Sequence, residues 1–473
     1  MKSKITFHIP FSVLRLPGTS RAALLCVLFL LVLNSCKDNW LDVKPKKSLV
    51  VLSTLTDLQS LLDNSAVMNG NQNGVSPSMG EISADNYYLA YSDWQSAVEI
   101  ERNCYLWSKQ IFNGNTSLDW NRAYQAVYYA NTALEDLEKI TQDNSNQADW
   151  NNIKGSALFY RAYSFYALAE IFAPHYKAAT AGSDLGIPLR MTSDLNEVSA
   201  RATVQQTFDQ VIADLKQAEN MLPVTPLYKT RPSKTAVDAL LARVYLSMGD
   251  YDNSLKYADS ALGLYNSLMD YNTLSLTAAY PMARFNAEVI FQSILNSSSI
   301  WSSRHKVDPA LYASYNASDL RQVLFFKTNT DGTKFFKGSY NAGTLFFCGL
   351  ATDELYLVRA ESRARKKDVN GALADLNFLL KSRFRTGTFV PVTAVDADDA
   401  LTKILAERRK ELIFRGLRWT DLRRLNEDSR FAMTLTRSLN GTAYTLSPLD
   451  PRYTLPIPDD VIAANPSIIQ NQR

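Results

Sequence analysis

Two glutamates and several arginines crowd the segment "ERRKELIFRGLRWTDLRR", residues 407–424. Glu407 and Glu411 stand four residues apart, so on a helix they would share one face, one turn from each other. Such a pair could act as the general acid and general base of a hydrolase. The same spacing also suits ion pairs, in which arginine forks on carboxylates lock a helix corner. The segment itself is compatible with both interpretations.

Residues for other common catalytic or metal sites are scarce. Beyond residue 35 the chain has two histidines, His175 and His305, which leave little for a histidine-rich metal site or a Ser-His-Asp triad. No Walker loop, GxGxxG, HExxH or GxSxG motif occurs. The stretch "TNTDGTK" (328–334) lacks the spacing of a calcium loop and predicts a turn. The sequence therefore favours a binding protein without catalysis, cofactor or metal.

A second stretch with chemical potential is "ADNYYLAYSDW", residues 84–94, which combines aromatic rings with Asp85 and Asn86. Rings at 87, 91 and 94 would share one face of a helix, so a core stripe is one interpretation. The polar flanks and the missing aliphatic stripe favour an exposed surface instead. Flat rings stack on the C–H faces of sugars, while amides and carboxylates bind the hydroxyls. The aromatic residues are Tyr87, Tyr88, Tyr91 and Trp94.

The N-terminus has the composition of a secretory signal. Four basic residues precede the apolar run "AALLCVLFLLVL" (22–33), and "NSC" follows. Twelve residues are too few to span a bilayer as a helix. The sequence "LNSC" (33–36) resembles a bacterial lipobox, which implies cleavage before Cys36 and acylation of that residue; an ordinary secreted protein is the alternative. The "KDN" that follows resembles a tag that sends Bacteroidetes lipoproteins to the cell surface.

The remainder of the chain has a balanced charge and few cysteines. Residues 1–35 contain four basic and no acidic residues, so 46 basic and 47 acidic residues remain, a net charge of about −1. This balance gives no electrostatic case for a nucleic-acid partner. Cys104 and Cys348 are the cysteines left after Cys36, and they could form a disulfide or remain two buried free thiols.

Helical hairpins are the elements that must position these groups. Residues 234–265 and 352–383 each predict two amphipathic helices around a polar turn, with the roughly 34-residue length and alanine-rich inner face of tetratricopeptide-like repeats. Looser helical segments cover 119–140, 153–172 and 203–222. The predicted fold class is all-α, an α-solenoid scaffold of such hairpins.

Long irregular insertions interrupt this scaffold. Residues 64–118 and 266–350 are rich in Asn, Ser, Thr, Gly and aromatics, with short strand-like runs such as "VIFQSIL" and "TLFFCGL". Insertions of this kind commonly carry function, so we expect them to form the ligand face. The tail "YTLPIPDDVIAANPSIIQNQR" contains too many prolines for a helix and predicts an extended segment.

Six segments, in the same order, resemble the SusD/RagB family of nutrient-binding outer-membrane lipoproteins of Bacteroidetes. They are "SCKDNWLDVKP", "YRAYSFYALAEIFA" with the following "DLGIPL", "NAEVIFQ", "DELYLVRAESRARK", "ILAERRKELIFRGLRWTDLRRL" and "LPIPDDVIAANPSIIQN". The resemblance covers nearly the whole chain beyond the signal. It implies a signal peptide (1–35), an N-terminal region (36–265) and a C-terminal region (266–473). It also makes the 407–424 segment a structural signature, which favours ion pairs over catalysis.

The resemblance implies a non-catalytic protein anchored in the outer membrane through Cys36 and exposed at the cell surface. Such a protein captures an oligosaccharide or polysaccharide and delivers it to a SusC-type TonB-dependent β-barrel transporter. The alternative is the same architecture binding peptides, as in RagB-like members.

The resemblance also implies where the ligand would bind. Relatives use platform aromatics after the first helix and after the "NxEVIF" strand. The corresponding stretches here are residues 84–94 and "SSSIWSSRHKVDP" (297–309). Contact of residues 85–94 with the transporter is an alternative, because Tyr and Trp are also favoured at protein interfaces. The predicted ligand-binding residues are Trp94, Trp301, Tyr91, Tyr88, Tyr87, Asn86, Asp85 and Arg304.

Overall fold

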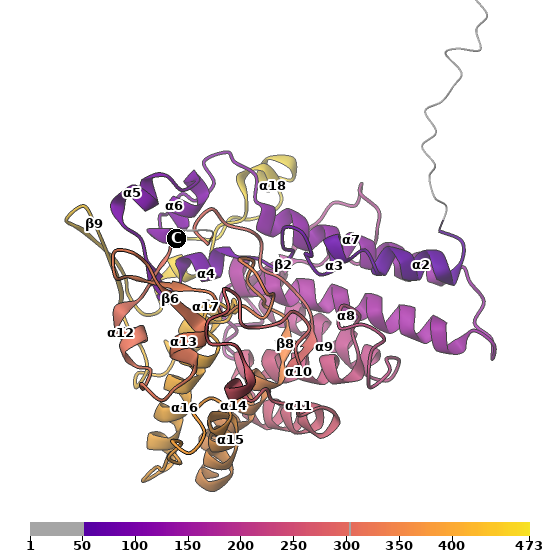
Figure 1. The fold of residues 1–473 in the computed structure, drawn as a ribbon. Helices are drawn as coiled ribbons and strands as arrows, with labels where there is room; N and C mark the ends of the chain where they lie inside the picture. The colour runs from indigo at the N-terminus through magenta and orange to yellow at the C-terminus, as the bar shows by residue number, and fades with distance from the viewer. Residues whose placement is uncertain (1–51, 302–303) are drawn as a thin grey trace, which may run out of the picture. The chain divides into compact units, whose positions relative to one another are not determined.

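The helical hairpins predicted from the sequence are present in the computed structural model (Figure 1), which describes residues 52–301 and 304–473. The predicted signal segment and Cys36 lie outside these residues. Residues 53–473 form one unit. Its longer helices are α7 (Leu118–Leu137), α8 (Gln147–Phe172), α9 (Val204–Glu219), α10 (Lys234–Met248), α11 (Tyr251–Leu264), α14 (Thr352–Arg365), α15 (Val369–Lys381) and α16 (Ala397–Glu411).

The hairpin of α10 and α11 illustrates how local sequence sets these elements. The Ser233 side chain accepts a hydrogen bond from the Ala236 backbone N–H and so caps the start of α10. Gly249 ends the helix in the left-handed conformation, with φ of 75°, which glycine adopts without a steric cost. The Asp250 side chain then caps the start of α11 by accepting from the Asn253 N–H. The turn and both helix ends are thus encoded within a few residues.

The helices pack as consecutive pairs. Helix α7 lies against α8, α8 against α9, α10 against α11, and α14 against α15. The α10–α11 pair joins the α14–α15 pair mainly through contacts of α11 with α14, and α16 lies on the other side of α14. Each helix therefore buries its apolar face against neighbours from adjacent hairpins. The predicted all-α class is confirmed in its coarser form: the described residues are mostly helical with a few short strands, and the two predicted hairpins are present as α10–α11 and α14–α15.

Short strands in the insertions join distant parts of the chain. The predicted run "VIFQSIL" contains the strand β4, which pairs with β8 at the end of the run "TLFFCGL". The predicted turn at 328–334 is also present, with Gly332 between the strands β6 and β7. All pairs are antiparallel. They are β1 (Tyr87–Tyr88) with β5 (Lys306–Val307), β2 (Leu185–Pro188) with β3 (Arg201–Thr203), β4 (Val289–Phe291) with β8 (Leu350–Ala351), β6 (Phe326–Thr328) with β7 (Lys334–Phe336), and β9 (Leu435–Leu439) with β10 (Thr442–Leu446).

Short helices make up much of the remaining chain. One of them, in the C-terminal tail, shows that the prediction of an extended tail is wrong. The tail was expected to be extended, yet it contains α18, which begins directly after Pro458 and carries Asp459 and Asp460 in its first turn. Proline before a helix and acidic residues in its first turn both favour a helix start. The short helices are α2 (Leu55–Leu62), α3 (Ser65–Met68), α4 (Met79–Ser83), α5 (Tyr91–Gln95), α6 (Glu99–Tyr105), α12 (Pro309–Ala313), α13 (Arg321–Phe325), α17 (Arg418–Leu425), α18 (Asp459–Ala464) and the 3-10 turns η2 (Tyr271–Thr273) and η3 (Pro451–Tyr453).

Two further observations concern cysteines and membrane spans. Cys104 and Cys348 are both buried and unbonded to each other, so the free-thiol alternative is the one realised. Burial raises the pKa of both thiols. Among the described residues, no helix combines the length and apolar composition needed to cross a bilayer.

Candidate functional site

Two aromatic rings stack on each other at the surface of α5. The ring centroids of Tyr91 and Trp94 lie 5.8 Å apart with an interplanar angle of 29°. Tyr91 is 43% exposed and Trp94 is half-buried. We call this pair the α5 platform. An exposed stacked pair offers flat apolar faces to a ligand without disturbing the core.

The five-residue helix α5 is held in place by Arg102 of α6. The guanidinium of Arg102 donates to the carbonyls of Gln95 and Ala97, at 3.1 and 2.9 Å. Carbonyls at the end of a helix have no partner within the helix, so this arginine satisfies groups that would otherwise remain open. The Trp94 indole N–H donates in turn to the Arg102 carbonyl at 3.2 Å. The platform is therefore fixed by its own flanking residues.

Polar groups border the platform. The Lys306 ammonium of β5 lies 3.1 Å from an oxygen of Asp93, and the Arg304 Nε–H donates to the Ser96 hydroxyl at 3.0 Å. The Arg102 guanidinium lies 5.9 Å from the centre of the Trp94 ring. Carboxylate, ammonium, guanidinium and hydroxyl groups beside stacked rings are the combination that binds a sugar by both its faces and its edges.

The strand β1 separates the tyrosines that precede the platform. Successive side chains of a strand point to opposite sides, and here Tyr87 is buried whereas Tyr88 is half-buried. The Tyr87 hydroxyl donates to the Ile82 carbonyl at 2.7 Å. Asn86 is also buried and donates to Glu81 at 2.9 Å. Tyr87 and Asn86 therefore belong to the core and offer no free surface to a ligand, contrary to their predicted place on the ligand face.

Trp301 is likewise a core residue in this structure, not a ligand platform. Its exposed fraction is 3%, and its ring packs against Tyr87, Phe346 and Phe414 at centroid distances of 5.2, 5.1 and 5.8 Å. The serines around it in the sequence suggested exposure, but aromatic residues from three distant segments enclose the ring. The pairing of Tyr87 with Val307 between β1 and β5 brings the two predicted loops together at this point.

Asp85 anchors the segment that leads to the platform. Its carboxylate accepts two hydrogen bonds from Arg418, at 2.6 and 2.9 Å, and lies 3.1 Å from Arg409. Burial alone would raise the pKa of this carboxyl, but the Arg418 and Arg409 guanidiniums outweigh it and hold the pKa well below its usual range. Because both oxygens of the Asp85 carboxylate already bind arginines, the residue has a structural role and not the ligand contact predicted for it.

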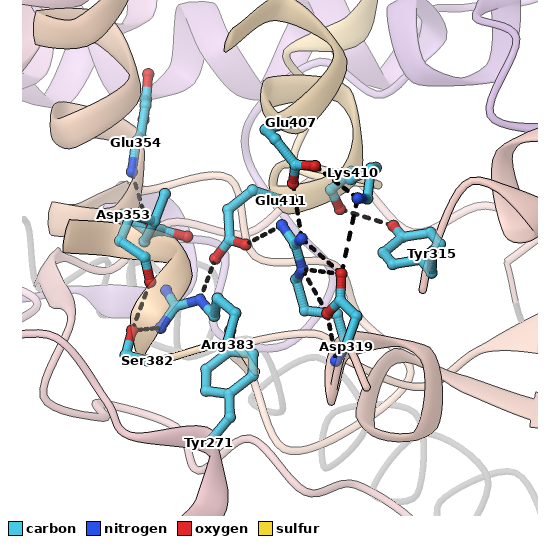
Figure 2. Close-up of polar contacts among 12 residues, drawn as sticks. Tyr271, Tyr315, Asp319, Asp353, Glu354, Ser382, Arg383, Glu407, Lys410 and Glu411 are labelled. Carbon is cyan, nitrogen blue, oxygen red and sulfur yellow. Dashed lines mark hydrogen bonds and ion pairs between the residues drawn. The ribbon is translucent and has the colours of Figure 1, made fainter. Parts of the chain in front are cut away.

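The carboxylates Glu407 and Glu411 form ion pairs, as the second interpretation of the sequence predicted. Both lie close to the fully buried Arg321, at 2.7 and 2.9 Å, and Glu411 also accepts from Arg383 at 2.7 Å. Figure 2 shows these groups turned toward one another, with Asp319 and Lys410 completing the network. Since each carboxylate is engaged by an arginine, the pair has no free acid or base for hydrolysis.

Glu411 also belongs to a buried cluster of three acidic residues, the one group among the described residues whose carboxylates are close enough to hold a metal ion. Carboxylate oxygens of Glu288, Asp353 and Glu411 lie within 4.8 Å of one another. Arg383 contacts Glu288 at 2.8 Å, and Arg415 contacts Asp353 at 3.1 Å. Each of the three carboxylates is paired with an arginine, so the cluster is a buried ion-pair network in which loss of one partner would leave a buried charge uncompensated.

Of the eight predicted ligand residues, the structure leaves four at a usable surface: Tyr88, Tyr91, Trp94 and Arg304. The contributions of Arg102 and Lys306 were missed. Arg102 lies eight residues after Trp94 on the next helix, α6, and Lys306 reaches Asp93 through the pairing of β1 with β5, so helical spacing signals neither contact.

Comparison with known proteins places the chain in a family. A family model described as starch-binding and associating with the outer membrane matches residues 39–246, and a model of the SusD family matches residues 352–473. Two SusD-like proteins of Formosa agariphila, P2 and P38, are 30% and 24% identical over 146 and 261 residues. These alignments cover 31% and 54% of this chain, and the chain spans 27% and 46% of those relatives.

Solved structures agree in fold. A SusD superfamily protein from Bacteroides thetaiotaomicron has a TM-score of 0.71 at 23% identity, over 89% of this chain and all of the other. A SusD-like carbohydrate binding protein from Bacteroides vulgatus has a TM-score of 0.67 at 19% identity, over 88% of this chain and 97% of the other. The two family models together match more than half of the chain. The chain therefore belongs to the SusD/RagB family, whose members are non-catalytic binding proteins associated with the outer membrane.

Proposed function

We propose that the protein captures a glycan on the α5 platform and delivers it to a SusC-type TonB-dependent transporter. The single observation that carries the proposal is the exposed stack of Tyr91 on Trp94, bordered by Asp93, Arg304 and Lys306. The family model described as starch-binding points to the same ligand class. The consecutive helix pairs would serve as a tetratricopeptide-like scaffold that presents this surface.

The proposed location is the cell surface, with a lipid on Cys36 as the anchor. The lipobox-like "LNSC" supports it, and so does the family's association with the outer membrane. Labelled palmitate should enter the wild-type chain and should be absent from Cys36→Ala. Equal labelling of both would contradict the anchor. The transporter should co-purify with the tagged full chain in mild detergent, and its absence at every detergent concentration would contradict the partnership.

Calorimetry with the full chain in detergent and a panel of oligosaccharides tests the ligand. Trp94→Ala and Tyr91→Ala should each weaken binding by about 1–3 kcal/mol, the scale known for rings stacked on bases. Tyr280→Ala is a matched control, because Tyr280 is 41% exposed and lies in another insertion. Unchanged affinity in both platform variants would overturn the site. Peptides co-purifying with the protein, in place of glycans, would overturn the ligand class.

A further inference from the structure

A cavity of about 750 Å³ lies away from the α5 platform, and none of the residues that line it belongs to the platform. Its walls are the outer face of α7, the segment 188–199 and the end of the chain from α18 to Ile468. Figure 1 shows α18 beside the first turns of α7. Ligand sites in proteins commonly have volumes of about 300–1,000 Å³, so the cavity is large enough for a small oligosaccharide.

One wall of this cavity is a ladder of aromatic rings. Trp120, Tyr124 and Tyr128 follow one another at intervals of four residues on α7, which places about one ring on each helical turn. The rings of Trp120 and Tyr124 are 4.8 Å apart. Trp120 is buried, Tyr124 is half-buried and Tyr128 is 40% exposed. The ladder thus runs from a closed inner end to an open outer end.

The segment that covers the ladder is fixed from both sides. The Asn131 side-chain amide on α7 donates to the carbonyls of Arg190 and Thr192, at 2.8 and 3.1 Å. The Asn465 side-chain amide, just after α18, donates to the Ser199 carbonyl at 2.6 Å. The cavity is therefore a built feature of the fold, closed by specific hydrogen bonds from both of its neighbouring elements.

The groups facing the ladder favour an uncharged, hydroxyl-rich ligand. Asp460 has a buried carboxylate oxygen, Oδ1, without a hydrogen-bond partner among the described residues. A buried acceptor of this kind favours a ligand that donates a hydroxyl and opposes a pure hydrocarbon. Asp460 and Glu197 together with Arg190 give the lining no excess of positive charge, so an anionic ligand has no attraction to it. Val198, Val461 and other aliphatic side chains supply a second apolar face.

We propose that this cavity, the α7 groove, is a second carbohydrate site, which binds a neutral oligosaccharide by stacking it on Tyr124 and Tyr128, with the buried Trp120 ring supporting Tyr124 from the inner end. The class of ligand rests on the proposed function, whereas the location does not. A sugar chain is bound by apolar contacts to its C–H faces and by hydrogen bonds to its hydroxyls. The groove supplies aromatic rings on one side, aliphatic side chains on the other and the Asp460 Oδ1 acceptor at the edge.

A blocking variant tests the groove. Ala464 is exposed and lines the cavity, whereas the adjacent Ala463 is exposed and does not. Ala464→Trp should fill the groove, and Ala463→Trp is its matched control. Both are made in the Trp94→Ala background, in which binding at the platform is weakened. The full chain is then titrated by calorimetry with maltohexaose, cellohexaose, laminarihexaose and, as an acidic comparison, hexagalacturonate.

In this background a neutral hexasaccharide should still bind, at one molecule per chain. Ala464→Trp should weaken this binding at least tenfold, Tyr128→Ala should weaken it as well, and Ala463→Trp should leave it unchanged. Hexagalacturonate should bind more weakly than the neutral sugar. Unfolding temperatures of all variants show whether each one is folded. If Ala464→Trp does not fold, the affinity of Tyr128→Ala tests the groove.

The remaining outcomes separate the two proposals. If all binding depends on Trp94, the groove is overturned and the platform stands. If binding survives Trp94→Ala unchanged and is lost in Ala464→Trp, the groove stands and the platform is overturned. Absence of binding by the wild-type chain to every member of the panel overturns both.

Discussion

Arg418 holds Asp85 by two parallel hydrogen bonds across 333 residues of sequence, with Nε–Oδ1 at 2.6 Å and Nη2–Oδ2 at 2.9 Å. Asp85 lies two residues before the strand β1, which leads to the helix α5, and Arg418 begins α17. The helix corner that the sequence marks as a family signature is thus the anchor of the segment that leads to the α5 platform. Gly416 reinforces it by donating its N–H to Glu81 at 3.0 Å.

Removal of this anchor should destabilise the protein. Arg418→Gln leaves Asp85 without its main partner in a largely buried position, and loss of one member of such a pair costs about 3–5 kcal/mol. Urea unfolding of the wild type and variant measures the change. Arg430→Gln is the control, because Arg430 pairs with Asp428 in a solvent-exposed position, where the expected loss is below about 1 kcal/mol. Equal stability of the wild type and Arg418→Gln would contradict the anchor.

The two tryptophans should respond differently to truncation. Trp301→Ala removes a ring from the aromatic core and should lower the free energy of unfolding by about 3–5 kcal/mol. Trp94→Ala removes a half-buried surface ring and should cost about 1 kcal/mol. Thermal and urea unfolding of both variants provide the comparison. Similar losses of unfolding free energy in the two variants would mean that the different burial of Trp301 and Trp94 does not govern their contributions to stability.

Glu81 should make stability fall with rising pH. Burial raises the pKa of its carboxyl from 4.5 to about 7, although hydrogen bonds from Asn86 and Gly416 oppose the shift. Below about pH 4.5 the group is protonated in both states. Between about pH 4.5 and 7 the unfolded chain ionises first, so the free energy of unfolding should drop by on the order of 3 kcal/mol.

Glu81→Gln provides the measurement, because an amide of the same shape cannot ionise. The difference in unfolding free energy between the variant and the wild type should grow in favour of the variant as the pH rises through this window. Other buried carboxyls titrate equally in both proteins and cancel in the difference. Parallel pH profiles would show that Glu81 ionises in the folded protein as easily as in water.

Gly349 should tolerate no side chain. A Cβ at this position would lie 1.9 Å from the Phe291 carbonyl oxygen, in the pairing of β4 with β8. Gly349→Ala should therefore lower the free energy of unfolding by about 1–3 kcal/mol or more. Gly343→Ala is a control within the same insertion, since its Cβ would meet its nearest neighbour at 3.8 Å. Equal stability of the two variants would show that the backbone of β8 shifts freely.

The helical scaffold could be predicted because its signals are local. The alternation of apolar residues, the small residues between helices and Gly249 at a turn all lie within one hairpin. The same holds for Tyr91 and Trp94, whose spacing of three residues puts their rings together on α5. Polar neighbours indicated a surface position, and in the structure Tyr91 is exposed and Trp94 is half-buried.

The fate of the other predicted ligand residues depends on contacts that a local pattern cannot show. Trp301 is buried by Phe346 and Phe414, and Asp85 is neutralised by Arg418. A strand of two residues, β1, is too short to give a period, so the opposite directions of Tyr87 and Tyr88 had no sequence signal. Composition around a residue describes its neighbours in the chain, while burial is decided by its neighbours in space.

The bond between Asp85 and Arg418 also has a consequence for how the protein is made. Asp85 leaves the ribosome 333 residues before Arg418, so the early hairpins can fold while residues 85–94 still lack their anchor. Pairing over such a sequence distance is intrinsically slow and comes late in folding. A chain interrupted before α17 would have most of its helices but would lack the arginine that fixes the proposed capture surface, so binding at that surface would report complete synthesis.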